Sequence, residues 1–340
     1  MTNDENYPID IVIPWVDGSD PAWLKERNEY ANKLRLSSTE DNTEARFRDW
    51  GTLKYVFRSI ELYAPWVNKI HLITWGHLPT WININVEKLN IVNHRDYIPE
   101  EYLPTFSSHT IELNMHRIRG LSDHFIYFND DILLLRPTHR KDFFVKGLPR
   151  DYAILNVISS SHRGSVMDTA LTDIEVINDH FEKNKVIRQN LLKWINIKYG
   201  RELFRTALLM PWPHFLTLHG THNCNSYLKS TFEKVWNCEY KLLDNTCKHN
   251  FRTRRDANQW LMREWQLCEG NFIPSSPNKS LNLSLKNDNT GIEKVLRRGK
   301  LLSVCINDNG AEEIIDFDKT SKELIEVLDD IFPEKSSFEK

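Results

Sequence analysis

The sequence predicts an α/β fold built on a mostly parallel, Rossmann-like sheet with a helical insertion. Two observations lead to this fold class. Apolar strand-like segments alternate with amphipathic helix-like segments through residues 10–135, and residues 160–275 are largely helical and aromatic in pattern. Alternation of this kind is typical of sheets whose parallel strands are joined by helices.

The expected strands are short and apolar, and turns or polar residues end them. The first covers residues 10–17 and is followed by a turn over residues 18–21. The other strand candidates are residues 69–75, 90–93, 125–128, 132–135 and 301–306.

Two helices are expected between these strands. One begins at Arg48, after an exposed loop over residues 36–45, and ends before Pro65. Its apolar side chains recur at helical spacing and are Leu53, Val56, Phe57 and Ile60.

The other helix is expected from about His109 to Arg119, with Ser108 as its cap and Gly120 at its end. It would place Glu112 and His116 on one face, four residues apart. From spacing alone, an exposed polar pair is the favoured interpretation of these two residues.

We expect a single domain, residues 1–340. Its α/β core would comprise residues 1–155 and 280–340, and the helical, aromatic-rich region would lie between them. A final amphipathic helix is expected near residues 320–332, because Thr320 and Glu323 have the spacing of a capping box.

Composition excludes several classes of protein. The net charge of −3 gives no basic field for nucleic acid. The sequence has no signal-peptide pattern and no apolar run of membrane-spanning length, so we expect a cytoplasmic protein. The five cysteines lack paired spacing, which suggests a reducing compartment. A zinc site is disfavoured for the same reason, and its ligands would be Cys224, Cys247, His219 and His222.

Acidic or amide residues follow three of the expected strands. Ligands of open α/β sheets bind beyond the carboxyl ends of the strands, and carboxylates gathered there repel each other unless a cation lies between them. The sequence therefore predicts a Mg²⁺ or Mn²⁺ site, although any single cluster could simply begin a turn. The clusters are Asp17 with Asp20, Asp130 with Asp131, and Asp308 with Asn307 and Asn309.

Two further segments could supply chemistry. Residues 214–222 hold three histidines, any of which could serve as a general base or merely pack or cap. Arg252, Arg254 and Arg255 could bind phosphate or form a solvated basic stretch. The usual glycine-rich phosphate motifs are absent from the sequence, so side chains and a metal ion must hold phosphate.

Four blocks of the sequence resemble the Stealth proteins, a family of hexose-1-phosphoryltransferases. The family includes bacterial capsule phosphotransferases and the alpha/beta subunit of the animal lysosomal-enzyme N-acetylglucosamine-1-phosphotransferase. The blocks are residues 9–20, 53–131, 219–256 and 303–333. Arg119 departs from the animal relatives, which carry an acidic residue there, and their large insertions are missing.

The resemblance implies a glycosyltransferase-A-like sheet that binds a nucleotide-sugar, and it assigns roles to individual residues. It implies a catalytic role for Glu112, Asp131, His222 and Arg252. We expect metal ligation by Asp130, Asp131 and Asp308. We expect substrate binding by Trp15, Val16, Asp17, Gly18, Arg117, Asn129, Asp130, Asn307 and Asp308.

The implied reaction transfers a hexose-1-phosphate, such as N-acetylglucosamine-1-phosphate, from a UDP-sugar to a sugar hydroxyl of a capsular or cell-surface polysaccharide, with release of UMP. Two alternatives remain at this point: a metal-dependent glycosyltransferase that releases UDP, and a non-catalytic polysaccharide-binding protein. Expected partners are the UDP-sugar, a polysaccharide or oligosaccharide acceptor and, through peripheral association at the inner face of the membrane, the capsule assembly machinery. The sequence leaves open the sugar, the linkage, the base of the nucleotide, the oligomeric state and the choice between His222 and Glu112 as general base.

Overall fold

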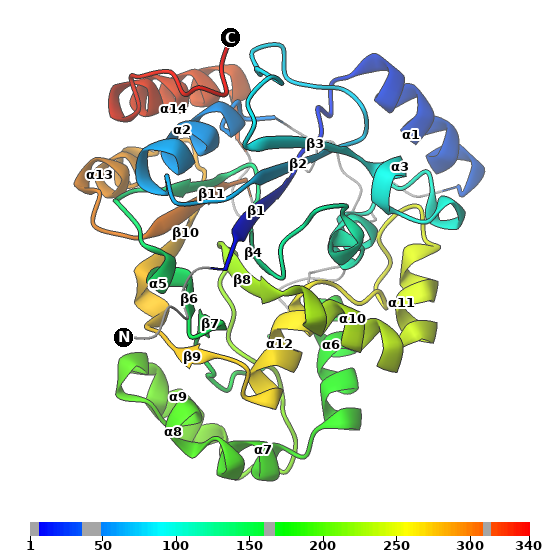
Figure 1. Cartoon of the computed structure of the whole chain (residues 1–340), viewed down its shortest axis with the longest axis vertical. Helices are drawn as coiled ribbons and strands as arrows, with labels where there is room; N and C mark the ends of the chain where they lie inside the picture. Colours follow the sequence, from blue (N-terminus) through cyan, green and yellow to red (C-terminus); the bar gives the residue numbers. More distant parts are fainter. Residues whose placement is uncertain (1–6, 36–48, 160–166, 309–313) are drawn as a thin grey trace.

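The computed structural model describes residues 7–35, 49–159, 167–308 and 314–340. It is a mixed α/β structure around a parallel sheet (Figure 1). The central sheet has the strand order β3-β2-β1-β4-β8, in which the first four strands are parallel and β8 is antiparallel to β4. These strands are β1 (Ile9–Pro14), β2 (Ile70–Thr74), β3 (Leu89–Asn93), β4 (His124–Tyr127) and β8 (Asn225–Leu228).

The strand order reverses direction at β1. The chain adds β2 and β3 on one side of β1 and then returns to add β4 on the other side. In open parallel sheets, the ligand crevice lies at such a reversal, outside the carboxyl ends of the two strands. Residues 15–18 leave β1 there, and residues 128–131 leave β4 there.

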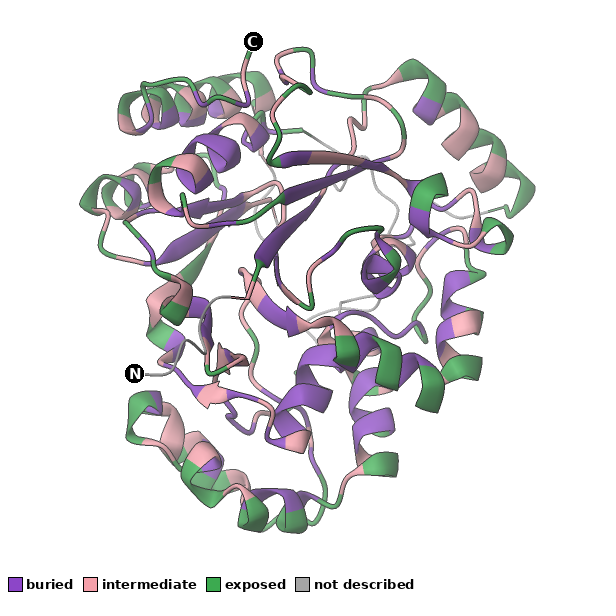
Figure 2. Cartoon of the chain, in the orientation of Figure 1, coloured by how far each residue is buried: buried purple, intermediate pink, exposed green. Residues whose placement is uncertain are grey.

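Alternating side chains of β1 enter two different apolar cores, as the period of a strand requires. Ile9, Ile11 and Ile13 belong to the core shared with α2, the second sheet and α14. Val12 belongs to the core shared with the helices of residues 167–269. The sheet is therefore covered on both faces, and its buried strands run through the middle of the molecule (Figure 2).

A second sheet has the order β10-β11-β5, with β10 parallel and β5 antiparallel to β11. Residues 128–131 join the two sheets, because β4 of the first is followed directly by β5 of the second. The bounds are β5 (Ile132–Leu134), β10 (Ser280–Ser284) and β11 (Ser303–Asn307). A third, small sheet consists of β6 (Phe144–Val145), β7 (Leu148–Asp151) and β9 (Ile273–Pro274).

The helices gather in two groups (Figure 1). Beside the second sheet lie α2 (Leu53–Tyr63), α13 (Thr290–Arg298) and α14 (Phe317–Ile331). On the other side lie α4 (Ser108–Leu113), α6 (Met167–His180), α10 (Lys229–Cys238), α11 (Tyr240–Cys247) and α12 (Trp260–Glu269). The remaining helices are α1 (Pro21–Lys33), α3 (His94–Tyr97), α5 (Arg140–Phe143), α7 (Lys183–Gln189), α8 (Leu191–Trp194) and α9 (Glu202–Leu209). Short 3-10 turns are η2 (Glu100–Tyr102), η3 (Met115–Arg117), η4 (Ile197–Tyr199) and η5 (Pro277–Lys279).

The expected strands are confirmed, with small changes at their ends. The helix before Pro65 is also confirmed, but residues 49–52 are not helical and it begins later than expected, at Leu53. The expected strand at residues 132–135 belongs to the second sheet, and β8 is a strand in a stretch that reads as helical in sequence. The final helix begins one turn earlier than Thr320, because the Asp316 side chain accepts a hydrogen bond from the Lys319 amide and caps it. The expected loop over residues 36–45 lies outside the described residues.

The helix expected from His109 to Arg119 is wrong in one respect, because it breaks at Asn114 into α4 and η3. The side-chain Nδ2 of Asn114 donates to the Thr110 carbonyl at 2.8 Å and so competes with the backbone hydrogen bonds of the helix. Glu112 and His116 therefore do not share a helical face. The His116 ring lies against Phe232, and burial lowers its pKa to about 3.

In the part of the chain that the structure describes, every helix is too short or too polar to cross a membrane.

Candidate active site

The turn that follows β4 carries Asn129, Asp130 and Asp131, and two other elements hold its backbone. The Thr52 hydroxyl, next to the start of α2, donates to the Asp130 carbonyl at 2.8 Å. The Ile306 amide of β11 donates to the Asp131 carbonyl at 2.9 Å. The turn is therefore fixed at the junction of the two sheets.

His222 lies beside this turn because of how β8 pairs with β4. Asn225 is opposite Tyr127 in that antiparallel pair, so the residues before β8 meet the residues after β4. The Asn129 Nδ2 and His222 Nε2 atoms form a hydrogen bond of 2.6 Å. His222 is only partly buried.

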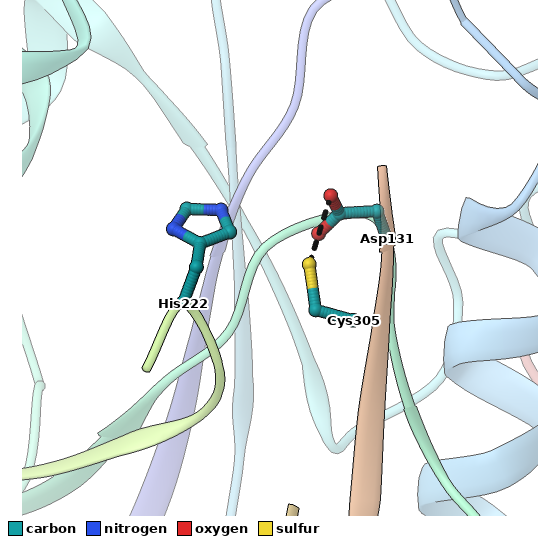
Figure 3. A group of neighbouring side chains, drawn as sticks. All are labelled: Asp131, His222 and Cys305. Atoms are coloured by element: carbon teal, nitrogen blue, oxygen red, sulfur yellow. Dashed lines mark hydrogen bonds between the residues drawn. The ribbon is translucent and has the colours of Figure 1, made fainter. Parts of the chain in front are cut away.

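Cys305 of β11 is the third side chain at the turn (Figure 3). Its Sγ donates to Asp131 Oδ2 at 3.2 Å, and the ligand atoms of Asp131, His222 and Cys305 lie within 4.8 Å of one another. Sequence reasoning missed Cys305. Its position could have indicated it: Cys305 lies two residues before Asn307 in the same strand, and alternate residues of a strand point to the same face.

The acidic groups of the turn lie close together and are partly buried. Burial, the charge of Asp131 and the charge of Asp49 raise the pKa of Asp130 well above its usual range. Burial likewise raises the pKa of Asp131, and His222 partly opposes this shift. Burial and the Asp131 charge raise the pKa of the Cys305 thiol, which keeps it protonated as a hydrogen-bond donor.

Oxygen atoms at the turn could hold a Mg²⁺ or Mn²⁺ ion. Asp131 Oδ1 and Asn307 Oδ1 are both buried, and neither has a hydrogen-bond partner among the described residues. Continuing the β11–β5 register places Asn307 opposite Asp130. A cation would relieve the repulsion that, together with burial, raises the pKa of Asp130. Hard divalent ions prefer oxygen ligands.

The acidic residues after β1 divide into two kinds. Asp20 caps α1 through the Ala22 and Trp23 amides, so it has the structural role of a helix cap. Asp17 accepts from the Ser19 amide and hydroxyl at 2.8 and 2.6 Å. Desolvation and the charge of Asp17 raise the pKa of Asp49. The charge of Asp49 in turn helps to raise the pKa of Asp130. Sequence reasoning missed Asp49.

Of the other predicted residues, Trp15, Val16 and Gly18 follow β1 of the central sheet, and Asp308 follows β11 of the second sheet. Trp15 is buried and packs edge-on against His77, with ring centroids 5.2 Å apart. Val16 and Gly18 are partly buried in the same loop, and Asp308 directly follows β11.

Glu112 is connected to the turn through Tyr127 of β4. Glu112 is buried, and the Tyr127 hydroxyl donates to its Oε1 at 2.8 Å. Burial raises the pKa of Tyr127 well above its usual range, and the charges of Glu112 and Asp131 raise it further. Glu112 and Asp131, both of predicted catalytic role, therefore both raise the pKa of the same tyrosine.

Arg252 reaches α4 because its loop is fastened to the segment before that helix. The Phe106 amide donates to the Asn250 carbonyl at 2.8 Å, and Asn250 Nδ2 donates to the Pro104 carbonyl at 2.6 Å. Arg252 Nη2 donates to the Ser108 hydroxyl at 2.5 Å.

Asp256 organises the same loop from within. Burial raises its pKa, but hydrogen bonds with His109, Thr253 and His249 outweigh this effect and leave the pKa below its usual value. The basic stretch in the sequence is thus ordered around a buried carboxylate. Arg254, in contrast, is exposed, and its Nε lies 3.5 Å from Asp168 Oδ2.

Arg117 does not join this group. It is exposed, and its guanidinium stacks over the Trp236 ring at 4.6 Å. The disfavoured zinc set is also dispersed: Cys247 Sγ is a hydrogen-bond acceptor of Asn114, Cys224 lies against Ser303, and His219 lies against Arg205.

A cavity of about 460 Å³ lies at the ends of β2 and β3, on the same edge of the central sheet. Trp75, Asn93, His94 and Thr105 are among its lining residues. His94 is buried, its Nδ1 has no partner among the described residues, and burial lowers its pKa to about 3. A neutral ring with a free polar atom is suited to a hydrogen bond with a ligand.

Comparison with known proteins identifies the family of the chain. Profiles of two conserved regions of Stealth proteins match the chain, region 1 over residues 7–35 and region 2 over residues 46–151. The capsular polysaccharide phosphotransferase WcwK of Streptococcus pneumoniae is 41% identical over 332 residues, which cover 98% of each chain. The exopolysaccharide phosphotransferase cps2G of Lactiplantibacillus plantarum is 37% identical, with 98% of this chain and 97% of that one covered. The receptor polysaccharide phosphotransferase WefC of Streptococcus gordonii is 36% identical, with 97% and 98% covered. The chain therefore belongs to the Stealth family and is a phosphotransferase.

Proposed function

We propose that this protein transfers a hexose-1-phosphate, such as N-acetylglucosamine-1-phosphate, from a UDP-sugar to a sugar hydroxyl of a capsular or exopolysaccharide chain. The observation that carries the proposal is the acidic turn over residues 129–131, which lies at the reversal of strand order with His222 beside it. The names of the similar proteins support a polysaccharide acceptor. A glycosyltransferase-A-like use of the sheet is part of the same proposal.

The donor would extend along the carboxyl edge of the central sheet. Its nucleoside would occupy the cavity beside Trp75, with the aromatic ring as a stacking surface and His94 Nδ1 as a polar contact. The volume of about 460 Å³ is in the range of small-molecule sites. Val16 packs in the same small apolar cluster as Trp75, which connects the cavity to the loop after β1.

Asp130 and Asp131 would hold Mg²⁺ or Mn²⁺, and Asn307 and Asp308 lie at the adjacent strand end. When bound, such an ion neutralises charge on a diphosphate. Arg252 would add a guanidinium that binds oxygens of the transferred phosphoryl group.

The acceptor hydroxyl oxygen forms the new bond to the phosphorus that carries the hexose. The bond from this phosphorus to the bridging oxygen breaks, and UMP leaves. His222 takes the hydroxyl proton in this proposal, because its ring is partly exposed, whereas Glu112 is buried. The product is a sugar–phosphate–sugar diester.

The test is to incubate the protein with UDP-N-acetylglucosamine, Mg²⁺ and an oligosaccharide of the acceptor polymer and to identify the released nucleotide. UMP is the expected product. Release of UDP would mean transfer at the sugar carbon, as in the glycosyltransferase alternative, and would exclude the proposal. The non-catalytic alternative is set aside, because the chain is a phosphotransferase.

Single variants of the site test the roles of its residues. Asp131→Ala and His222→Ala should each lower kcat by about a hundredfold or more while circular dichroism stays unchanged. Asp20→Ala is the matched control, since it removes a carboxylate of the same region that only caps α1. Turnover near the wild-type value in either site variant would remove that residue from the mechanism.

A further inference from the structure

Residues 181–212 form a helical arm that contains α7, α8, η4 and α9. The arm lies at the edge of the molecule opposite α14 (Figure 1). None of the residues assigned to the active site belongs to it.

The inner side of the arm is firmly packed. Trp194 and Tyr199 are fully buried, and the Trp194 ring lies 5.6 Å from that of Phe215. The buried Lys183 ammonium donates to the Leu209 and Met210 carbonyls at 3.1 and 2.9 Å, and it also contacts the Trp212 carbonyl. These bonds hold the end of α9 against α7, so the arm has a defined outer surface.

Large apolar side chains cover that outer surface. Ile197, Leu192, Phe204 and Leu208 expose 90%, 82%, 76% and 73% of their surface. Phe204 and Leu208 are four residues apart and share one face of α9. The six residues that we group as the apolar face of the arm are Leu191, Leu192, Ile197, Phe204, Leu208 and Trp212. Six exposed large apolar side chains within one short helical segment are typical of an interaction surface.

The arm is also strongly basic. Residues 181–212 include seven Lys and Arg residues and two Glu residues, whereas the whole chain has a net charge of −3. Lys185, Arg188 and Arg201 are exposed. Arg201 lies three residues before Phe204 and therefore flanks the apolar face.

We propose that the apolar face of the arm inserts into the headgroup region of an anionic lipid bilayer. Helices that lie in a membrane interface combine Leu, Ile, Phe and Trp on one side with Lys and Arg around them, because both apolar burial and attraction to anionic lipids contribute. A second copy of the chain is a poorer occupant. Two-fold pairing of this face would bring the same basic side chains together, and juxtaposed like charges are costly.

The test is flotation of the full chain with vesicles of phosphatidylcholine mixed with phosphatidylglycerol, compared with phosphatidylcholine alone. We expect binding to the mixed vesicles that weakens as NaCl is added, and much weaker binding to phosphatidylcholine. No binding to the mixed vesicles would overturn the proposal.

Two double variants, each with a control, separate the apolar and the electrostatic contributions to vesicle binding. Phe204→Ser combined with Leu208→Ser should lower the partition coefficient by about tenfold or more. The control Leu62→Ser combined with Ile84→Ser removes residues of 57% and 56% exposure elsewhere and should bind normally. Arg188→Glu combined with Arg201→Glu should weaken binding to the mixed vesicles, whereas the charge-matched control Lys294→Glu with Arg298→Glu should not.

Sedimentation velocity without lipid tests whether the apolar face of the arm instead binds a second copy of the chain. We expect the wild type and the Phe204→Ser, Leu208→Ser variant to sediment alike. A wild-type dimer that this variant converts to monomer would show that the face binds a second copy and would overturn the proposal. Equal vesicle binding by the wild type and this variant would overturn it as well.

Discussion

Tyr127 joins two groups of side chains that are distant in the sequence. It is buried on β4, its hydroxyl donates to Glu112, and two residues later the chain reaches Asn129, which contacts His222. The buried Glu112 carboxylate needs a hydrogen-bond donor, and the Tyr127 hydroxyl supplies one. The Tyr127 hydroxyl therefore links Glu112 of α4 to the strand that leads into the acidic turn.

We expect Tyr127→Phe to lower kcat by about tenfold, because Glu112 loses the contact that positions it. The lost buried hydrogen bond should also lower the free energy of unfolding by about 1 kcal/mol. Steady-state kinetics and urea unfolding measure the two effects.

Tyr97→Phe is the matched control, since the buried Tyr97 hydroxyl donates to the Ile111 carbonyl at 3.0 Å. It should cost similar stability without a comparable loss of turnover. Equal losses of turnover in both variants would show that Tyr127 has no specific connection to the reaction.

At the scale of elements, α12 packs against α6 with two carboxyl groups between them that the proposed reaction does not use. Glu264 of α12 and Asp173 of α6 are both buried. Burial raises the pKa of Glu264 to about 8, and Arg263 and a backbone hydrogen bond at Leu218 oppose the shift. Burial and the charge of Glu264 raise the pKa of Asp173 well above its usual range. Both groups thus favour the protonated state in the folded protein.

This interface predicts a pH dependence of stability. The folded state holds the Glu264 proton more tightly than the unfolded state, so the stabilisation is complete below pH 4.5 and is lost as the pH rises toward about 8. Glu264→Gln should therefore be more stable than the wild type by at least about 1 kcal/mol at pH 8, with a smaller difference at pH 4.5.

Thermal and urea unfolding across this pH range measure the difference. Glu233→Gln on α10 is the control, because Glu233 is exposed and should not change the slope. Parallel stability curves for the wild type and Glu264→Gln would contradict the prediction.

At the scale of the whole molecule, α2 is joined to residues 332–340 by a buried ion pair. Arg58 Nε and Nη2 donate to the two carboxylate oxygens of Glu339, both at 2.8 Å, and Nη1 donates to the Phe332 carbonyl at 2.6 Å. The backbone of Glu339 also forms an isolated antiparallel β-bridge with Ile82. Segments more than 250 residues apart in the chain are therefore fastened to each other.

We expect Arg58→Ala to lower the free energy of unfolding by about 3–5 kcal/mol, because it leaves the Glu339 carboxylate buried without its partner. Arg58→Lys should recover only part of the loss, since an ammonium cannot form the bidentate contact.

A double-mutant cycle with Glu339→Ala measures the coupling, and the double variant should be less destabilised than the two single effects would sum to. Additive effects would show that the pair contributes no interaction energy of its own.

The comparison between sequence and structure separates local from non-local information. Hydrophobic period predicted β1, β2, β3, β4 and α2, because strand and helix periods are properties of neighbouring residues. The acidic turn was also visible in the sequence, since it directly follows an apolar strand. The matches over four blocks identified the Stealth family, which the similar proteins confirm. The catalytic roles of Glu112, Asp131, His222 and Arg252 stay predictions.

Only the tertiary structure decided which residues surround that turn. Cys305 reaches Asp131 because β11 is antiparallel to β5, and His222 reaches Asn129 because β8 is antiparallel to β4. The two pairings join residues 174 and 93 positions apart, and no local pattern encodes such a distance. The sequence by itself thus determined most strands of the α/β core, α2 and the acidic turn. Strand pairing between remote segments determined the site, because pairing depends on the packing of the whole chain.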